Sequence, residues 1–155
     1  MMDLMSMFLA IWYILPTYFA NMAPVVFGGG SPIDRGRNWI DGRRILGDHK
    51  TFRGLISGII VGTTIGIIQL RPIQGVLLST GAMVGDLIGS FIKRRLDIPP
   101  GGNAVLLDHE GFLVFSILFC FWYEPISIKQ TIFLIIITPI LYEITNFIAR
   151  KLNLK

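Results

Sequence analysis

The sequence has few charged residues and almost no cysteine. Charged residues make up 15% of its 155 residues, against roughly 25% in a typical soluble domain. Its one cysteine, Cys120, excludes an internal disulfide and lies in an apolar run, where a small buried side chain is the default. Hydrophobic residues, in contrast, make up 52% of the chain. These figures exclude a typical soluble globule, a disordered tail and a disulfide-bonded secreted domain.

Long apolar runs account for the hydrophobic content. A helix needs about 20 apolar residues to cross a bilayer, and the alternating segments of a membrane β-barrel are absent from the sequence. The first run lacks the basic start and the cleavage site of a signal peptide, so we expect it to be retained. We predict an all-α integral membrane protein, one transmembrane domain over residues 1–155 with five spans. The spans are about 4–27, 55–70, 76–92, 112–123 and 128–149.

Lysine and arginine are distributed unevenly between the loops. Loops 28–54 and 93–111 and the C-terminal tail hold twelve of the 14 basic residues, whereas Arg71 and Lys129 stand alone in short turns. Cytoplasmic loops of membrane proteins are enriched in basic residues. We therefore expect a multi-pass protein of the cell membrane with both long loops and the C-terminus in the cytoplasm and the N-terminus outside. A bilayer surface then explains the net charge of +4, and no nucleic acid is expected as a partner.

Glycine recurs every four residues in the second and third spans. This spacing keeps small residues on one helix face and lets two backbones approach closely in lipid. The pattern predicts tight packing of the two helices, and the alternative is that glycine leaves room for a ligand beside Asp86. The repeats are Gly54, Gly58, Gly62 and Gly66, and Gly81, Gly85 and Gly89.

Asp86 lies inside the third span, about 10 Å from its cytoplasmic end. A carboxylate at that depth is costly, so it is a functional-site hypothesis by default. Ser90, Lys93 and Asp97 follow on the same helix face, which would present a carboxylate, a hydroxyl and an ammonium group together. A contact between Asp86 and Lys93 within the helix is the structural alternative, although seven residues separate them by two turns.

The first span ends with a polar amide and a helix breaker, Asn21 and Pro24. We expect them to close the helix and to open backbone carbonyls near the same membrane face. Irregular backbone at membrane depth is tolerated where it lines a cavity.

Loop 28–54 is dense in glycine and in charges of both signs. Cations and glycine N–H groups suit phosphates, whereas Asp34, Asp41 and Asp48 suit Mg²⁺. The alternative, a basic anchor for acidic lipid heads, explains neither the aspartates nor the glycines. Loop 93–111 returns Asp108 toward the membrane face of Asp86, so the two carboxylates are candidates to share metal ions. We thus expect two polar cytoplasmic loops to form a charged cavity.

Transfer at phosphorus is the chemistry that these residues suit, because the protein there mainly positions anions and neutralises charge. A phosphate monoester is already anionic at pH 7 and needs no general base. A polar cavity that faces the cytoplasm from within a membrane protein indicates that one substrate is a lipid. The rival hypothesis is a non-catalytic transporter or a scaffold whose loops bind anionic lipids, although a transporter should show paired repeats and this sequence shows none.

The motifs together resemble the CDP-archaeol synthase family, which is related to bacterial CDP-diacylglycerol synthases. The resemblance is carried by Asn21-Met22-Ala23-Pro24, Pro32-Ile33-Asp34, the string from Asp41 to Gly54, Gly85-Asp86-Leu87 with Ser90, Lys93 and Arg94, and Thr145-Asn146-Phe147-Ile148-Ala149. It implies a five-helix, Mg²⁺-dependent cytidylyltransferase. The substrates would be CTP and an unsaturated archaeal glycerol-ether lipid phosphate, and pyrophosphate would be released.

The resemblance also implies roles for individual residues. Asp86 and Asp108 would hold the metal and, with Lys93, form the catalytic set. Gly111 stands where the family usually has a second aspartate, so that either Glu110 takes its place or a second metal is held differently. The residues expected to bind substrate are Asn21, Asp41, Arg43, Lys50, Thr51, Arg53, Ser90 and Arg94.

Overall fold

The structure, a computed structural model, describes residues 2–99 and 105–151. For residues 105–109, 142–143 and 145–151 it describes the backbone alone. The described part of the chain is all-helical, as predicted, with no strand beyond two isolated bridges. Its helices are α1 (Leu4–Phe27), α2 (Phe52–Ile68), α3 (Pro72–Arg95), α4 (Val105–Cys120) and α5 (Ile128–Lys151).

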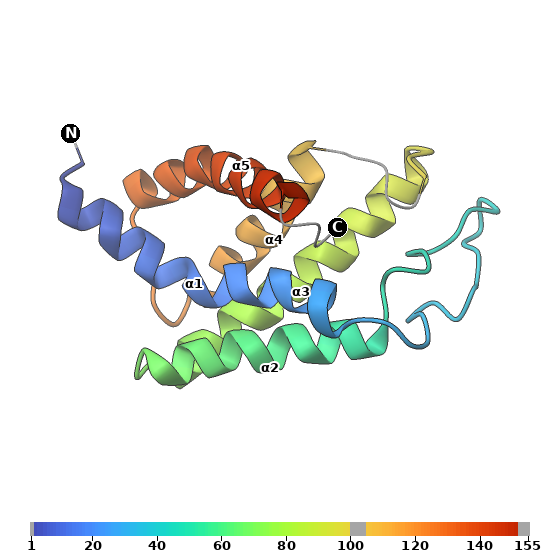
Figure 1. The fold of residues 1–155 in the computed structure, drawn as a ribbon, viewed down its shortest axis with the longest axis horizontal. Helices are drawn as coiled ribbons and strands as arrows, with labels where there is room; N and C mark the ends of the chain where they lie inside the picture. Colours follow the sequence, from blue (N-terminus) through green and yellow to red (C-terminus); the bar gives the residue numbers. More distant parts are fainter. Residues whose placement is uncertain (1, 100–104, 152–155) are drawn as a thin grey trace.

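Helix α3 lies at the centre of the bundle. It packs between α2 and α4 and also touches α1, whereas α5 covers α1 and α4 (Figure 1). The start of α1, the α2–α3 turn and the start of α5 lie at one end, and the long segment between α1 and α2 extends from the other end beside the last turns of α3. The core contains Ile14, Leu78, Leu113, Cys120 and Leu134, all fully buried.

Helix α2 has an inverted distribution of side chains for a protein in water. The residues it buries are its four glycines, Gly54, Gly58, Gly62 and Gly66, whereas isoleucines such as Ile56, Ile60 and Ile67 are more than half exposed. A helix of a water-soluble protein turns its large apolar residues inward. Small residues inside and large apolar residues outside are instead typical of helices that pack within lipid.

The glycines of α2 set how this helix packs against α3. A Cβ added to Gly66 would lie 2.5 Å from Cα of Gly75, and one added to Gly62 would lie 2.5 Å from Cβ of Ser79 in α3. These contacts confirm that the glycines of α2 bring α2 and α3 close together. Gly81 and Gly85 of α3 face α4 instead, which corrects the expectation that the two glycine repeats pack against each other. Because the two helices are antiparallel, the start of α2 lies beside Asp86. The nine residues that follow Asp86, up to Arg95, extend α3 beyond that level by about 14 Å.

Proline does not break α1, which corrects the expectation that Asn21 and Pro24 close it. The helix continues through Pro16 and Pro24 to Phe27. A proline inside a helix removes the hydrogen bond to the carbonyl four residues earlier. At Pro16 the missing donor is replaced from the end of α2: Nε2 of Gln69, the C-cap residue of that helix, donates to the carbonyl of Trp12 at 2.7 Å.

The helices exceed several of the predicted spans. Helix α2 starts at Phe52 because the Thr51 side chain caps it, and α3 starts at Pro72, a residue well suited to the first helical turn. Asp97 does not share the α3 face with Asp86, because the helix ends at Arg95 and Asp97 has a positive φ of 58°. Asp97 therefore drops out of the group predicted to share one face of α3, which leaves Asp86, Ser90 and Lys93.

Two of the described helices, α1 and α3, are long and apolar enough to cross a membrane by length and composition. The other apolar stretches are shorter, at Phe52–Ile68, Glu110–Cys120 and Ile128–Leu141. The number of spans and the orientation of the termini stay predictions.

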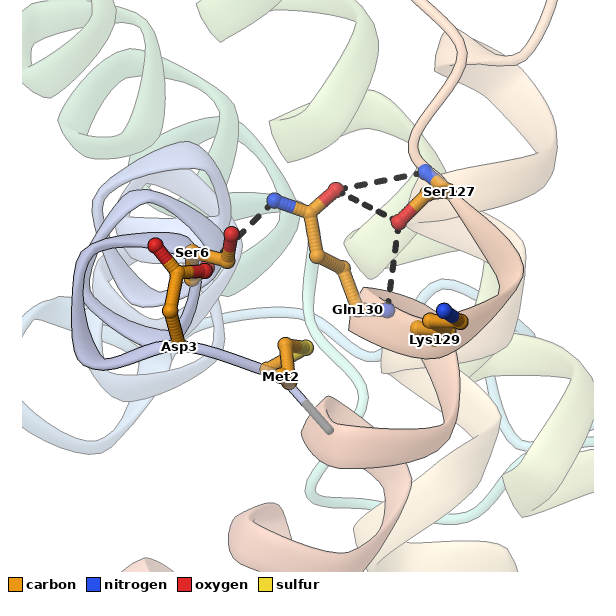
Figure 2. A pocket seen from close by; sticks show the side chains of 6 residues that line it. All are labelled: Met2, Asp3, Ser6, Ser127, Lys129 and Gln130. Atoms are coloured by element: carbon orange, nitrogen blue, oxygen red, sulfur yellow. Dashed lines mark hydrogen bonds between the residues drawn. The ribbon is translucent and has the colours of Figure 1, made fainter.

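A shallow pocket lies between the starts of α1 and α5 (Figure 2). Ser127 and Gln130 form a reciprocal cap there, since Ser127 N donates to Gln130 Oε1 and Gln130 N donates to Ser127 Oγ, both at 3.3 Å. Gln130 Nε2 also reaches the carbonyl of Ser6 at 3.4 Å. The pocket lies at the end opposite Asp86 and contains none of the predicted site residues.

Candidate active site at the end of α3

Lys50 and Asp86 form an ion pair between the α1–α2 segment and α3. Lys50 Nζ lies 2.7 Å from Oδ1 and 2.6 Å from Oδ2 of Asp86, so that one ammonium group binds both carboxylate oxygens. The side chains are 24% and 28% exposed, which leaves the pair open to solutes on one side. The structure thus joins two predicted site residues that are 36 positions apart. Asp86 pairs here with Lys50, and the alternative of an intrahelical contact with Lys93 is not needed to explain how its charge is balanced.

The backbone around Lys50 is held on both sides. Its carbonyl accepts a hydrogen bond from Ile33 N at 2.8 Å, and its N–H donates to the carbonyl of Gly47 at 3.2 Å. The next residue, Thr51, is buried and caps α2 by accepting from Gly54 N at 3.1 Å. Thr51, expected to bind substrate, therefore has a structural role: by capping α2 it fixes the position of the Lys50 backbone.

The carboxylate of Asp34 organises the segment between α1 and α2. It accepts hydrogen bonds from the Arg44 guanidinium and from the backbone N–H groups of Gly36, Leu46 and Gly47. Burial by itself raises the pKa of a carboxyl group, but Arg44 and these backbone donors together hold the pKa of Asp34 well below its usual range. Gly36 and Gly47 both have positive φ, which favours glycine. Their N–H groups bind Asp34, so these two are not available to phosphates.

The other two aspartates of the segment also pair with arginines. Asp48 Oδ1 lies 2.8 Å from Arg44 Nη2, and Asp41 Oδ2 lies 2.9 Å from Arg95 Nε. The acidic residues between α1 and α2 therefore balance neighbouring guanidinium groups in this structure. These aspartates were expected to suit Mg²⁺, and each pairs with an arginine instead. Among the described carboxylates at this end of the bundle, Asp86 differs because it pairs with a lysine.

Arginine side chains fasten the segment to the end of α3. Arg43 donates to the carbonyl of Arg95 and to Asp97 Oδ2. Arg95 donates in turn to the carbonyl of Arg44 at 2.6 Å, and its guanidinium lies 4.7 Å above the Phe91 ring. Trp39 meets the same ring edge-on at 5.4 Å. Arg43, expected to bind substrate, is thus one of several residues that hold the segment against the last two turns of α3.

The remaining predicted residues differ in exposure. Ser90 and Arg94 are buried in α3, and Arg94 Nη2 donates to the carbonyl of Pro99 at 3.1 Å. Lys93 and Asn21 are half-buried, whereas Arg53 is exposed in the first turn of α2. Arg53 and Lys50 therefore flank Thr51 at the α2 N-terminus, where aligned backbone N–H groups favour negative charge.

Helix α4 passes Asp86 at Gly111. A Cβ built on Gly85 would lie 2.5 Å from the carbonyl oxygen of Gly111, so the two backbones touch one residue before Asp86. Asp108 lies one turn earlier in α4, and its side chain is outside the described part of the structure. Its predicted role as a metal ligand therefore stays a prediction.

Two features of this end were missed by the sequence interpretation. Asp34 had been grouped with possible metal ligands, and Arg95 had been counted only as a basic residue. The sequence signal for Asp34 is a pair of glycines that follow it, Gly36 and Gly47, which permit the backbone to turn toward one carboxylate. Arg95 carried no such signal, because its partners come from residues more than 50 positions away.

The fold and the Lys50–Asp86 ion pair define a class of protein: an all-helical membrane protein in which a polar segment between two helices packs against a carboxylate in the C-terminal half of the central helix. The chain belongs to the CDP-archaeol synthase family, since the family model described as CarS-like, CDP-archaeol synthase, matches residues 1–155. This confirms the resemblance noted from the motifs.

Similar proteins match along nearly the whole chain. A CDP-archaeol synthase of Thermococcus gammatolerans is 50% identical, covering 98% of this chain and 96% of its own. One from Methanocaldococcus jannaschii is 40% identical, covering 96% and 95%. A solved structure, described as an intramembrane enzyme for archaeal membrane lipid biosynthesis, has 34% identity and a TM-score of 0.84, covering 89% of this chain and 92% of its own.

Proposed function

We propose that this protein is a cytidylyltransferase that forms CDP-archaeol from CTP and an unsaturated archaeal glycerol-ether lipid phosphate, releasing pyrophosphate. Membership of the CDP-archaeol synthase family supports the product. The observation that carries the proposal is the partly exposed Lys50–Asp86 pair, which puts a cation and a carboxylate together on the C-terminal half of α3. Helix α2 buries its glycines and exposes its isoleucines, which supports a site next to lipid, where such a substrate would be dissolved.

Basic side chains from different elements converge on this end of the bundle and suit a triphosphate. Lys50 and Arg53 flank the α2 N-terminus, whose positive partial charge adds to theirs. Lys93 and Arg94 lie on the last turns of α3, on the other side of Asp86 along the chain. In our proposal Lys50 and Arg53 hold phosphates from the α2 side and Lys93 from the α3 side, while buried Arg94 keeps the end of α3 in place.

In the proposed reaction an oxygen of the lipid phosphate attacks the α-phosphorus of CTP. The new P–O bond forms as the bond from the α-phosphorus to the bridging oxygen breaks, and that oxygen leaves on pyrophosphate with the electron pair. No general base is needed because the lipid phosphate is already an anion near pH 7. The chain's contribution is to bring two anions together by means of its lysine and arginine side chains, which offset their repulsion.

Mg²⁺ is the proposed cofactor, and the donor chemistry at Asp86 fits it. Mg²⁺ is commonly bound through one or two carboxylates together with substrate phosphates and water. Among the residues whose side chains are described, no group of three His, Cys, Asp or Glu is assembled to enclose a metal by itself. Asp86, with Asp108 as its proposed partner, would hold the ion. Bound there, Mg²⁺ would supply positive charge for the pyrophosphate that leaves.

We further propose that all five helices cross the cell membrane, with the N-terminus outside and the end that carries Asp86 facing the cytoplasm. The distribution of basic residues supports this orientation, because the segment between α1 and α2 and the end of α3 hold most of them. CTP, a water-soluble substrate, would enter from that side.

The test is CTP-dependent release of pyrophosphate by the purified protein in detergent or lipid. We expect release when Mg²⁺ and an unsaturated ether-lipid phosphate are both present, together with a CDP-lipid detected by mass spectrometry. Omission of the lipid phosphate is the control that separates transfer from simple CTP hydrolysis. Lipid binding without pyrophosphate release would contradict the proposal and favour the scaffold hypothesis.

A further inference from the structure

The ammonium group of Lys50 occupies the site on Asp86 that a metal ion needs. It contacts both carboxylate oxygens, at 2.7 Å and 2.6 Å, so a metal ion would meet the ammonium group at either oxygen. A Mg²⁺ ion binds carboxylate oxygens at about 2.0–2.1 Å. An ammonium group and a divalent cation compete for those oxygens, because two like charges so close together repel each other.

The chain around Lys50 permits the side chain to move while its backbone stays. The Lys50 carbonyl and N–H are bonded to Ile33 and Gly47, and Thr51 fixes the start of α2. The side chain itself is 24% exposed and unbranched, with four flexible carbon–carbon bonds. A nearby alternative for its charge exists, since the α2 N-terminus beside Arg53 is the region where the proposed function puts the phosphates.

We infer that Lys50 is the resting counter-ion of Asp86 and exchanges places with the metal. Without nucleotide, Lys50 holds Asp86 and weakens metal binding there. When metal and nucleotide arrive together, Lys50 transfers its ammonium group from Asp86 to a phosphate oxygen of the nucleotide. Lys50 is in this respect a positioning residue, and the inference rests on the proposed function for the identity of the nucleotide.

This exchange couples the binding of the metal to that of the nucleotide. A metal ion alone must displace Lys50 with no compensating partner for the ammonium group, whereas nucleotide phosphates provide that partner. The free energy that the metal spends in displacing Lys50 is then offset by the new contact between Lys50 and the nucleotide. The two ligands therefore favour each other's binding, which is positive coupling. The exchange also keeps the carboxylate neutralised at every stage, which matters next to lipid.

The experiment measures Mn²⁺ binding to the full-length protein in detergent by electron paramagnetic resonance, with no nucleotide present. We expect Lys50→Met to bind Mn²⁺ about 3- to 10-fold more tightly than the wild type, a change that corresponds to about 0.6–1.4 kcal/mol. Lys50→Arg keeps the positive charge and should bind Mn²⁺ as weakly as the wild type. Lys50→Met combined with Asp86→Asn should lose the gain, which assigns it to this carboxylate.

The matched control is Asp97→Asn, which removes another ion pair of the same segment, with the residues just after α3, without touching Asp86. Its Mn²⁺ affinity should equal that of the wild type. If Lys50→Met binds Mn²⁺ no more tightly than the wild type, or if Asp97→Asn gains as much, the exchange is wrong and Lys50 is a permanent tether. Lys50→Gln, a second neutral variant, gives the same comparison if the methionine variant unfolds.

A second measurement tests the coupling itself. Addition of CTP should tighten Mn²⁺ binding to the wild type more than to Lys50→Met, and equal tightening in both would overturn the exchange. Failure of the proposed function would look different. In that case the wild type forms no CDP-lipid from CTP, whatever the Mn²⁺ affinities are, whereas a failed exchange leaves wild-type product formation intact.

Discussion

Gly85 in α3 and Gly111 in α4 bring their helix backbones into direct contact, and the contact is one-sided. A Cβ on Gly85 would lie 2.5 Å from the carbonyl oxygen of Gly111, whereas a Cβ on Gly111 would meet, among the described atoms, the carbonyl oxygen of Gly85 at 3.5 Å. The first distance is a severe overlap with backbone, and the second is ordinary van der Waals contact. The site carboxylate, Asp86, is the next residue along α3.

This asymmetry predicts opposite results for two alanine substitutions. Gly85→Ala should destabilise the protein by about 1–3 kcal/mol, because α3 and α4 must separate to admit the methyl group. Gly111→Ala should leave stability unchanged or raise it slightly, since alanine restricts the unfolded chain without a clash. Thermal unfolding in detergent measures both. Equal stability of the two variants would show that α3 and α4 do not approach in this way.

Asp34→Asn should loosen the segment between α1 and α2. The substitution removes the negative charge that Arg44 and three backbone N–H groups share, and we expect a loss of about 2–3 kcal/mol in the stability of that segment. Hydrogen exchange of residues 31–51, compared with exchange in α3, measures the loss locally. Asp48→Asn is the matched control, because Asp48 is largely exposed and its pair with Arg44 should contribute little.

The effect of Asp34 should depend on pH with a definite sign. Its folded-state pKa is lowered, so its stabilising contribution is present above the unfolded value of about 3.9 and is lost as pH falls through the folded value. The difference in segment stability between the wild type and Asp34→Asn should therefore be constant at neutral pH and shrink below about pH 4. A difference that grows on acidification would contradict the assignment.

Asp86→Asn should abolish turnover while the protein still folds and inserts in membranes. Asparagine has nearly the same shape but cannot balance Lys50 or hold a divalent cation in the same way. Pyrophosphate release and CDP-lipid formation measure the loss, and thermal unfolding with gel filtration in detergent checks the fold. Activity close to that of the wild type would remove Asp86 from the catalytic set.

Lys93→Ala should raise the CTP concentration needed for half-maximal rate and also slow the maximal rate. The reason is that we assign Lys93 to the phosphates of CTP, whose charge grows on the leaving pyrophosphate during the reaction. Initial rates over a range of CTP concentrations separate the two effects. A variant with both values unchanged would return Lys93 to the role of an anchor for acidic lipid heads.

The number and type of the helices could be predicted from the sequence, because hydrophobic run length depends on local composition alone. The approach of α2 to α3 was predicted for the same reason, since the glycine spacing encodes a smooth face. The position of the end of α1 was predicted correctly, but the expectation that Asn21 and Pro24 close the helix was wrong. The helix passes through Pro16 and Pro24 to Phe27, and the Trp12 carbonyl freed by Pro16 finds a partner in Gln69, the residue that caps the end of α2.

The candidate site was only partly predictable. Asp86 stood out because a carboxylate in an apolar run is costly, and Lys50 because it lies in a charged loop. Their pairing could not be read from either position, since it depends on Thr51 capping α2 at the level of Asp86. The aspartates at 34, 41 and 48 looked like metal ligands by composition, whereas the fold pairs each with an arginine.

That the chain is helical, apolar on its outside and basic at one end follows from residue types and their spacing, which can be read before the fold is known. Which charges meet depends on the fold. An ion pair depends on distances of a few ångströms between segments far apart in the chain, and those distances are set by where the glycine faces let α2, α3 and α4 come to rest against one another.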